Sequence, residues 1–508
     1  MSAVAAGGSD EWDVVVIGGG PPGENAAQYA TESSGLSAVI IEEKLVGGEC
    51  SYWACMPSKA LLRPVELREE ERLVPGLDGA GRRLGVDAVL AWRDRVVNGH
   101  DDRSQVQWAE GAGIAVVRGR GRLKGVRAVE VEDPAGGRRV IRARQAVVLD
   151  TGSRPLVPDV PGLAHALAWT SRDVTNLHDV PRRVAIIGGG TVACEAATWL
   201  LGFGAEIVHI IEQGDALLAR SEPFARDLVL GALGRAGADV RLNTKVRSVR
   251  RDAPRATGEG RLHGGAVEIV LSGGERLTVD EIVVAAGRLP NSIDIGLDTV
   301  GLPAGGPIVV DDQLRVAGVD GDWLYAVGDV CGRAQLTHMG KYQARVAGDV
   351  IAARAAGRPL ALGDASPHRD RADDGEVPQV AFTSPPVAWV GRTEEAARAH
   401  GIEVEVVEYD LGAVAGTSLQ GPGAGGRAKL VLDAHARLIV GATFVGPGAP
   451  ELLHSATVAI VGRVPLDLLW HAVPSYPTVS EVWLRLLETE RRQRAERAKK
   501  RESDRHTA

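Results

Sequence analysis

Two of the four cysteines in this chain lie five residues apart, in a short glycine-rich segment. The segment reads GGECSYWACMPSK and contains Cys50 and Cys55. This spacing fits neither the short-gap zinc pattern nor the C-x-x-C motif of thioredoxin-like proteins. In an ideal helix, residue i+5 lies about 7.5 Å further along the axis and about 140° around it. A disulfide between these cysteines therefore requires an unwound turn before a regular helix begins near Pro57. Two unrelated packed thiols are the alternative.

The composition limits the class of protein to which the chain can belong. It has 508 residues, too many for a single core, and a formal net charge of −8, which does not indicate a nucleic-acid partner. It contains no apolar run of membrane length, and the first residues, MSAVAAGGSDEWD, lack the apolar stretch of a signal peptide. We therefore expect a cytoplasmic protein without a membrane partner. Because structural disulfides are rare in the cytoplasm, a close cysteine pair is more often catalytic. Cys194 and Cys331 are expected to be small packed residues.

The first part of the chain has the pattern of a dinucleotide-binding unit. An apolar strand, Val14–Ile17, leads into the glycine-rich loop Gly18–Gly23 and an alanine-rich helix. A second apolar strand, Ala38–Ile41, ends at Glu42. In a G-x-G-x-x-G loop the glycines let the backbone approach a pyrophosphate at the helix N-terminus, and the acid binds ribose hydroxyls. The flanking strands and the acid make this motif specific.

The same pattern returns in the middle of the chain. The strand Val184–Ile187 leads into Gly188–Ala193 and a helix, and the strand Ile207–Ile211 is followed by Glu212. Two such units imply two dinucleotides in one chain. We therefore expect electrons to pass from one dinucleotide to the other, since a dehydrogenase with a single cofactor needs only one unit.

The order of these motifs resembles the pyridine nucleotide-disulfide oxidoreductases, the flavoprotein family of dihydrolipoamide dehydrogenase, glutathione reductase and mercuric reductase. The resemblance runs from about Asp13 to about Glu488. The motifs that carry it occur in family order: GGGPPG, GGEC…CMPSK, Asp150–Ser153, GGGTVACE, Ala286–Asn291, Tyr325–Val330, Ala381–Pro386 and Tyr476–Glu481.

The resemblance implies an α/β fold with two Rossmann-like dinucleotide-binding domains and a C-terminal α+β dimerisation domain. FAD would bind the first unit and NAD(P)H the second, and the enzyme would be a homodimer in which the C-terminal domain completes the other subunit's site. The expected domains are a first FAD-binding segment at 1–155, an NAD(P)-binding domain at 156–294, a second FAD-binding or central segment at 295–365, a dimerisation domain at 376–488 and a disordered basic tail at 489–508.

The resemblance also implies a role for each site residue. Cys55 would be the charge-transfer thiol beside the flavin and Cys50 the interchange thiol that faces the substrate. Lys59 and Glu195 would form a pair near the flavin N5, and Asp329 would hydrogen-bond the ribityl chain. No metal site is expected. The residues expected to bind the two cofactors are Gly18, Gly20, Gly23, Glu42, Gly48, Lys59, Gly121, Thr151, Gly152, Gly188, Gly190, Ala193, Glu195, Glu212, Gly287, Arg288, Gly328, Asp329, Leu336, Thr337 and His338.

The chain departs from the family pattern near its C-terminus. Reductases of this family usually end in His-Pro-Thr-x-Ser-Glu, and the histidine acts as acid and base for the interchange thiol of the other subunit. Here Tyr476 replaces that histidine, while Glu481 is retained. A tyrosine with a pKa of about 10 is ionised to about one part in a thousand at pH 7, so Tyr476 cannot simply act as the base. Trp53, between the cysteines, either stacks near the flavin or packs in the core.

The identity of the terminal electron acceptor therefore stays open between a disulfide, a quinone and a metal ion. The leading hypothesis is an FAD-dependent NAD(P)H:disulfide oxidoreductase similar to dihydrolipoamide dehydrogenase. The alternatives are an enzyme similar to mercuric reductase, a quinone reductase or soluble transhydrogenase, and a redox sensor without turnover. Glu212 and the lack of Arg or Lys over 212–218 favour NAD(H) over NADP(H). Ala193, in place of the third glycine, leaves NADP(H) as the alternative.

Overall fold

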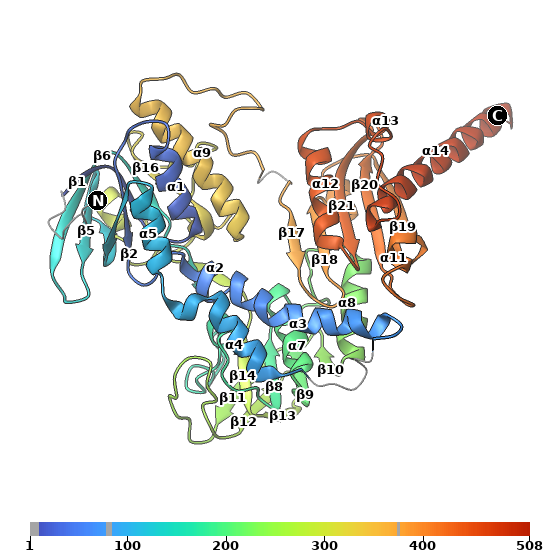
Figure 1. Cartoon of the computed structure of the whole chain (residues 1–508), viewed down its shortest axis with the longest axis horizontal. Helices are drawn as coiled ribbons and strands as arrows, with labels where there is room; N and C mark the ends of the chain where they lie inside the picture. Colours follow the sequence, from blue (N-terminus) through green and yellow to red (C-terminus); the bar gives the residue numbers. More distant parts are fainter. Residues whose placement is uncertain (1–9, 78–83, 373–375, 508) are drawn as a thin grey trace. The chain divides into compact units, whose positions relative to one another are not determined.

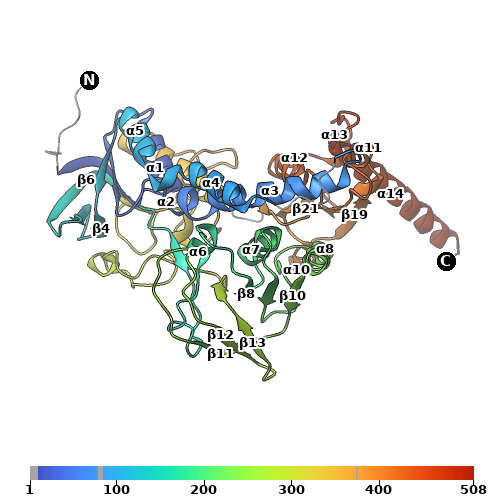
Figure 2. The same cartoon turned by 60° about the horizontal axis from the view of Figure 1, so that its bottom comes forward.

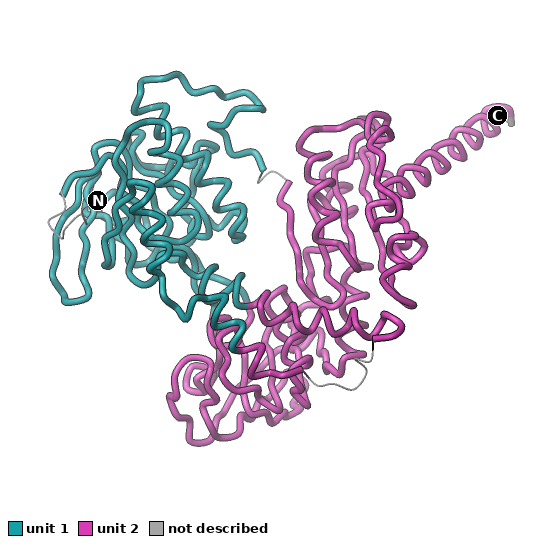
Figure 3. The backbone as a smooth tube through the Cα atoms, in the orientation of Figure 1, with its two compact units in different colours: residues 1–57, 91–156, 287–373 teal, residues 58–90, 157–286, 374–508 magenta. Residues whose placement is uncertain are grey.

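The computed structural model describes residues 10–77, 84–372 and 376–507. The expected lack of a signal peptide concerns mainly residues 1–9, which lie outside these ranges. Two compact units make up the described chain (Figure 3). Unit 1 contains residues 1–57, 91–156 and 287–373, and unit 2 contains residues 58–90, 157–286 and 374–508. Each unit is thus assembled from three separate stretches of sequence.

Unit 1 is built around a seven-stranded sheet whose parallel strands are buried. The sheet has the order β3-β2-β1-β6-β5-β4, and β16 pairs in parallel with the end of β6. Strand β16 joins this sheet from a segment far along the chain, so residues after the second nucleotide unit complete the first one. The strands are β1 (Glu11–Ile17), β2 (Ala38–Glu42), β3 (Ile114–Arg118), β4 (Arg120–Leu123), β5 (Ala128–Glu132), β6 (Arg138–Leu149) and β16 (Leu324–Ala326).

Helices α1 (Pro21–Thr31) and α9 (Thr337–Ala355) lie side by side against this sheet (Figure 1). Two glycines of α9 make the close approach achievable. A Cβ atom on Gly348 would lie 2.5 Å from the Cβ of Tyr29, and one on Gly340 would lie 2.6 Å from the Cγ of Pro22. Unit 1 also contains α2 (Gly48–Tyr52), α5 (Arg103–Gly111), η1 (Asn98–His100), η2 (Leu297–Val300), η3 (Gly328–Cys331), and the paired strands β7 (Ser153–Pro155) and β15 (Arg288–Pro290).

Unit 2 contains a second parallel sheet, with the order β10-β9-β8-β14. Its strands are β8 (Arg183–Ile187), β9 (Ile207–Ile211), β10 (Ala238–Arg241) and β14 (Glu281–Val284). Helices α6 (Ser171–Thr175), α7 (Thr191–Gly202) and α8 (Pro223–Arg235) belong to the same domain. A separate antiparallel sheet is formed by β11 (Val246–Arg251), β12 (Val267–Leu271) and β13 (Arg276–Val279) (Figure 2). Helices α3 (Cys55–Leu73) and α4 (Val86–Val96) each cross a limit between the two units, after Pro57 and after Leu90.

The C-terminal part of unit 2 is an antiparallel sheet with the order β17-β18-β21-β20-β19. Its strands are β17 (Gln379–Ala381), β18 (Val387–Gly391), β19 (Val404–Asp410), β20 (Arg427–Asp433) and β21 (Leu438–Val445). Its helices are α10 (Glu394–Ala399), η4 (Leu411–Ala413), α11 (Ala415–Ser418), α12 (Ala449–Val461), α13 (Leu466–Leu469), η5 (Val479–Glu481) and α14 (Val482–Thr507). The sheet of unit 1 has parallel strands with antiparallel β4 and β5 at one edge, and the first sheet of unit 2 is parallel. Together with this α+β part, they confirm the fold class expected from the sequence.

The prediction of a disordered tail is wrong for residues 489–507. They continue α14, which extends beyond the sheet as a single helix (Figure 1). Arg497 of this helix forms an ion pair with Glu405 of β19 at 2.5 Å, and Arg491 lies 4.2 Å from the ring centre of Trp470. These contacts anchor the first half of the basic segment. Of the helices in the described ranges, none has the length and the apolar run that a bilayer crossing requires.

Candidate active site

The helix break expected between the two cysteines is present. Helix α2 ends at Tyr52, the next residue, Trp53, has a φ of −131° and a ψ of −1° that are not helical, and α3 begins at Cys55. Cys50 therefore lies in one helix and Cys55 at the start of the next, two residues before the expected start at Pro57. Both cysteines are half-buried.

The surroundings of Cys55 favour a negative charge on its sulfur. As the first residue of α3, it lies at the positive end of the helix dipole. Its Sγ atom is 3.3 Å from the Oγ1 atom of Thr337, the first residue of α9. Two helix N-termini of unit 1 thus approach the same sulfur atom. The other two cysteines behave as expected from the sequence, since Cys194 and Cys331 are buried, and burial raises the pKa of Cys194 to about 12.

Trp53 packs in a small aromatic cluster. Its ring centre is 5.8 Å from that of Tyr52 and 5.3 Å from that of His100. Val97 is the buried aliphatic residue of the same cluster. This arrangement corresponds to the core-packing alternative for Trp53, and it fixes the end of α2 two residues after Cys50.

Lys59 and Glu195, which the sequence predicts as a pair, form an ion pair inside unit 2. The Nζ atom of Lys59 lies 2.9 Å from Oε2 of Glu195, a residue that is 3% exposed in the second turn of α7. The backbone N–H of Phe382 donates to the other oxygen of Glu195 at 2.9 Å, and Lys59 lies 4.7 Å from the centre of the Phe382 ring. Phe382 was not among the predicted site residues. Its place in the motif Ala381–Pro386 was the signal that could have identified it.

The first glycine loop has the shape of a dinucleotide cradle. At Gly18, where φ is +104°, a Cβ atom would lie 2.0 Å from the backbone oxygen of Asp150. A Cβ atom on Gly23 would lie 2.3 Å from the oxygen of Gly18. Glu42, at the end of β2, accepts a hydrogen bond from the Gly19 N–H at 2.8 Å, and burial raises its pKa. The loop therefore requires glycine, and its residues fit the close approach of a cofactor.

The second glycine loop has a similar geometry with more open space. A Cβ atom on Gly188 would lie 2.4 Å from the oxygen of Ala285, whereas one on Gly190 would meet no atom within 4 Å. Glu212, after β9, accepts from the Gly214 N–H at 2.6 Å. Ala193 is fully buried in α7. This unit also fits a dinucleotide, with its acid at the same strand end as Glu42.

Asp329 belongs to a network that connects three segments of unit 1. Ser153 Oγ donates to Asp329 Oδ2 at 2.5 Å, and Arg288 Nε donates to Ser153 Oγ at 2.7 Å. Arg288 also lies 3.7 Å from Glu49, the neighbour of Cys50 in α2. Burial raises the pKa of Asp329, while the bond from Ser153 and the charge of Arg288 lower it. Ser153 was quoted only as part of a motif and was missed as a site residue.

The remaining predicted residues of unit 1 lie in several segments of this unit. A Cβ atom on Gly48 would lie 2.8 Å from the Cα of Gly20, so α2 begins against the first glycine loop. Thr151 Oγ1 donates to the Asn291 oxygen at 2.7 Å. Further predicted residues have these positions: Gly121 packs against Ile17 and Ile41, Gly152 and Gly287 have positive φ, the Gly328 N–H donates to Gln343, Leu336 precedes α9, and His338 is in its first turn.

Tyr476 and Glu481 lie in unit 2. Tyr476 is 75% exposed, whereas Glu481 is buried. One oxygen of Glu481 accepts from Arg485 at 2.5 Å, and the other, also buried, has no hydrogen-bond partner within the described ranges. Among the described residues, no group of three or more His, Cys, Asp and Glu side chains is arranged to hold a metal ion.

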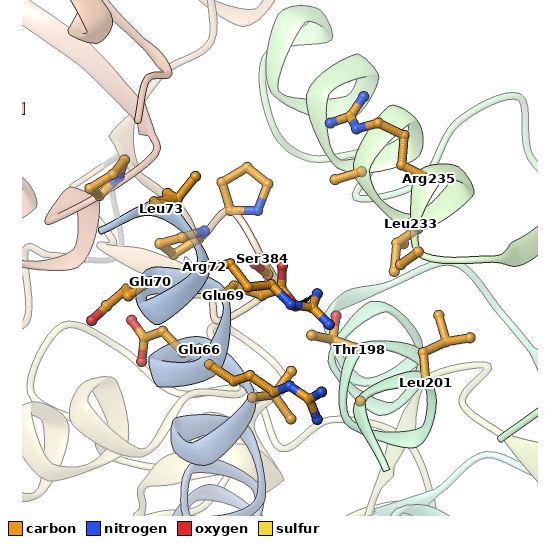
Figure 4. A pocket seen from close by; sticks show the side chains of 18 of the residues that line it. Glu66, Glu69, Glu70, Arg72, Leu73, Thr198, Leu201, Leu233, Arg235 and Ser384 are labelled. Atoms are coloured by element: carbon orange, nitrogen blue, oxygen red, sulfur yellow. Dashed lines mark hydrogen bonds and ion pairs between the residues drawn. The ribbon is translucent and has the colours of Figure 1, made fainter. Parts of the chain in front are cut away.

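Unit 2 also contains a cavity of about 1560 Å³ with many charged side chains in its wall (Figure 4). Glu66, Glu69 and Arg72 of α3 line it, together with Leu233 and Arg235 from α8. None of the site residues predicted from the sequence is among the described residues that line this cavity. It is therefore separate from the two glycine loops and the cysteine pair.

The comparison with known proteins agrees with these features. Residues 12–344 match the family described as pyridine nucleotide-disulphide oxidoreductase. The chain belongs to this family. Residues 377–486 match its dimerisation domain, which supports a homodimer. Family membership makes the protein an FAD-dependent oxidoreductase that uses NAD(P)H and a disulfide redox centre.

Curated relatives in the family cover almost the whole chain. It is 31% identical over 481 residues to a dihydrolipoyl dehydrogenase of Chlamydia muridarum, which is 94% of this chain and 96% of the relative. It is 30% identical over 480 residues to a glutathione reductase of Burkholderia cepacia, which is 94% of this chain and 98% of the relative. In fold it is similar to a Cu(II) complex of the HOCl-induced flavoprotein disulfide reductase RclA of Escherichia coli, with a TM-score of 0.78, 24% identity, and coverage of 94% of this chain and 99% of that one.

Proposed function

We propose that this oxidoreductase exchanges electrons between NAD(H) and a small dithiol or disulfide of the dihydrolipoamide type. The observation that carries the proposal is the cysteine pair itself, with Cys50 in α2 and Cys55 at the start of α3 against Thr337. The dihydrolipoyl dehydrogenase of Chlamydia muridarum, 31% identical over 94% of this chain, supports the substrate class.

In the direction of disulfide reduction, the two sulfurs act in sequence. The Cys50 thiolate attacks one sulfur of the substrate disulfide, a Cys50–substrate disulfide forms, and the other substrate sulfur leaves and takes a proton. The Cys55 thiolate then attacks Cys50 Sγ, which forms the Cys50–Cys55 disulfide and releases the second substrate thiol. One disulfide is thereby reduced and one dithiol oxidised. Bound FAD supplies the two-electron chemistry that returns the pair to the dithiol at the expense of NADH.

The other residues of the site bind and orient. We assign FAD to the first glycine loop, with Gly18, Gly20, Gly23 and Glu42, and to the Asp329 network. NAD(H) is assigned to the second loop, with Glu212 at the ribose. The Lys59–Glu195 pair provides a held positive charge, since Glu195 is buried and fixed by the Phe382 N–H. The domain limits inferred from the sequence, 1–155 with 295–365 for FAD and 156–294 for NAD(H), belong to this proposal.

The test is an anaerobic titration of the purified protein with NADH, followed by mixing with different acceptors. We expect one equivalent of NADH to reduce the disulfide centre, and lipoamide to reoxidise it faster than glutathione disulfide. Rapid reoxidation by a benzoquinone or Hg(II), together with none by either disulfide, would overturn the proposed substrate class. Catalytic oxidation of NADH by any of these acceptors would exclude a sensor without turnover.

A quinone or metal ion as acceptor is the second candidate, and Tyr476 favours it. The side chain at the position of the family's histidine is an exposed phenol, which has no imidazole nitrogen to act as the base for the interchange thiol. An acceptor that needs no proton transfer at Cys50 would be less affected by this substitution. We also place the enzyme in the cytoplasm, where NADH is supplied and a dithiol pair stays reducible.

A further inference from the structure

The first turn of α1 has few backbone N–H groups left for an anion. Its first two residues, Pro21 and Pro22, have no N–H. The third, Gly23, donates its N–H to the Oδ2 atom of Asp150 at 2.7 Å. A helix N-terminus binds phosphate through these first N–H groups. At the first two positions of this helix there is therefore no N–H group to offer, and the N–H of the third is already bonded to Asp150.

The loop that precedes α1 offers few further backbone N–H groups to an anion. The Gly18 N–H donates to the oxygen of Ile41 at 2.9 Å, and the Gly19 N–H donates to Glu42 at 2.8 Å. Within the described residues this leaves Gly20 as the loop glycine whose N–H has no partner. A dinucleotide that binds here gains one N–H group directly, and gains a second if Asp150 releases Gly23.

The carboxyl of Asp150 lies under the loop. Asp150 follows β6, and its N–H donates to the oxygen of Ile17 at 2.8 Å. A Cβ atom on Gly20 would lie 3.0 Å from Oδ2 of Asp150, and one on Gly328 would lie 3.1 Å from Oδ1. The residue is 6% exposed. Asp150 belongs to the motif Asp150–Ser153 but was not among the site residues predicted from the sequence.

The second nucleotide unit has an alanine at the equivalent position. Ala285 follows β14, and its N–H donates to the oxygen of Ile187 at 2.8 Å, as that of Asp150 does to Ile17. Gly188 lies against the oxygen of Ala285 in the same way that Gly18 lies against Asp150. Helix α7 begins with Thr191 rather than with two prolines. The two glycine loops of this chain therefore have similar backbone surroundings, but only the first has a carboxylate, that of Asp150, beneath it.

The surroundings of Asp150 disfavour its ionised form. Burial raises the pKa of Asp150 well above its usual range, and the charges of Asp329, Glu42 and Glu24 raise it further, while the Gly23 N–H lowers it. These acids lie on η3, β2 and α1. Each of these acids has a cation near it. Arg288 is near Asp329, Arg118 is near Glu42, and Lys341 is near Glu24.

We propose that Asp150 competes with the diphosphate of FAD for the N-terminus of α1, so that binding of FAD to the first unit is coupled to the uptake of a proton by this carboxyl. An ionised Asp150 retains the Gly23 N–H and repels the diphosphate. A protonated Asp150 carries no charge and accepts only a weaker hydrogen bond from that N–H, so the diphosphate can replace it. The affinity for FAD is then full below the pKa of Asp150 in the free protein, and it falls as the pH rises towards the pKa in the complex.

The test measures FAD binding rather than turnover, so it is independent of the acceptor, although it rests on the assignment of FAD to the first unit. Holoenzyme is diluted at pH 6, 7, 8 and 9, and released FAD is followed by its fluorescence to give a dissociation constant. In the wild type we expect the dissociation constant to rise about ten-fold or more over this range, since one proton gives at most ten-fold per pH unit. In Asp150→Ala, which installs the side chain of Ala285, we expect a rise about ten-fold smaller and tighter binding at pH 9.

Two further variants keep the outcome decisive. Asp150→Asn retains the shape of the side chain without its charge and should also flatten the pH dependence, even if the alanine variant folds poorly. Asp133→Asn is the matched control, because Asp133 is an exposed carboxylate that also accepts backbone N–H groups, from Ala135 and Gly137. It should keep the wild-type slope. A wild-type slope in both Asp150 variants, a flat wild type, or loss of FAD from both variants at every pH would overturn the proposal.

Discussion

At the scale of single residues, the two sulfurs of the pair have different surroundings. Cys55 occupies the first position of α3, next to the Thr337 hydroxyl, whereas Cys50 lies in the middle of the five-residue helix α2. Because the positive end of a helix stabilises a thiolate, the negative charge of the reduced pair should reside on Cys55. The two cysteines are therefore not interchangeable.

This difference predicts opposite effects of two serine substitutions on the absorbance of the protein. Reduction by two electrons should give a long-wavelength thiolate-to-flavin absorption band. Cys55→Ser should abolish this band, whereas Cys50→Ser should show it before any reduction, because Cys55 is then a thiolate that cannot form the disulfide. Anaerobic absorption spectra of the two variants check this. A Cys55→Ser protein that keeps the band would reverse the assignment of the sulfurs.

Glu212 predicts the choice of pyridine nucleotide. Its carboxylate lies at the end of β9, held by the Gly214 N–H, where it would repel a 2′-phosphate. We expect kcat/KM to be about ten-fold higher for NADH than for NADPH, which corresponds to about 1–2 kcal/mol. Glu212→Ala should remove most of this preference. Glu206→Ala, at an exposed acid of the same unit, should leave it unchanged, and faster reduction by NADPH than by NADH would show that Glu212 has another role.

Some residue positions could be predicted from the sequence and others could not. Gly18, Gly23 and Glu42 follow from local spacing, because a strand, a turn and a helix N-terminus demand them within 25 residues. Asp150 bonds a glycine 127 positions away, and Ser153 bonds Asp329 at a separation of 176. Such partners are fixed by tertiary folding, and no local pattern contains them.

At the scale of elements, α1 carries a half-buried acid close to its N-terminus. Burial raises the pKa of Glu24 to about 7, and Lys341 lowers it only partly. Its Oε1 atom is buried without a hydrogen-bond partner in the described part of the chain. The charged form of Glu24 is thus unfavourable in the folded state, and unit 1 loses stability as the pH rises from the unfolded pKa of about 4.5 towards 7.

Glu24→Gln should therefore stabilise the protein at pH 8 but not at pH 4.5. The expected gain in the free energy of unfolding at pH 8 is about 3 kcal/mol, because the pKa of Glu24 differs by about 2.5 between the two states and each unit corresponds to roughly 1.4 kcal/mol. Urea unfolding of the holoenzyme at the two pH values measures it. Glu32→Gln, at the exposed C-terminal end of the same helix, is the control and should change little at either pH. An equal gain at both pH values would mean that the effect does not arise from ionisation.

The full length of helix α14 could not be predicted from the sequence. Its last residues have no apolar periodicity, so a solvated tail was expected. The helix continues because its arginines find acidic and aromatic partners, such as Arg497 with Glu405 and Arg494 with Glu490 four residues earlier. Glu405 lies 92 positions away on β19, so a sequence window over the tail does not include it.

At the scale of the whole molecule, the motif order predicted what local patterns did not. Unit 1 combines residues 1–57, 91–156 and 287–373, and β16 completes its sheet. Periodicity alone gives two separate nucleotide units, and only the resemblance to a family implied that the first is resumed after the second. The dimerisation domain was likewise predicted from its motifs and not from any pattern in its strands.

The homodimer is also where we expect the substitution at Tyr476 to take effect. In this family the C-terminal domain of one subunit supplies the base for the interchange thiol of the other, and here Tyr476 has no imidazole nitrogen that could act as that base. Reduction of disulfides should therefore be slow at pH 7 and should rise towards the pKa of a thiol. Glu481 is buried nearby in sequence, and its second oxygen accepts no hydrogen bond within the described residues, so it can accept one from an imidazole.

Tyr476→His should accordingly raise lipoamide turnover at pH 7 about ten- to a hundred-fold, the lower range of general-base effects, with little change in NADH–quinone activity. Tyr476→Phe is the matched control, because it removes the hydroxyl without adding a base, and it should leave lipoamide turnover low. Mixed dimers of Tyr476→His with Cys50→Ser subunits test the exchange between subunits. One of their two sites joins an intact Cys50 to Tyr476, and the other joins the introduced histidine to the introduced serine, which has no thiol to activate. If the base acts across the dimer, these mixed dimers should lack the gain, whereas a gain retained in them would place the base on the same subunit as its thiol. Unchanged turnover in a folded Tyr476→His homodimer would instead give Tyr476 its own role with the substrate and favour a quinone or metal ion as acceptor.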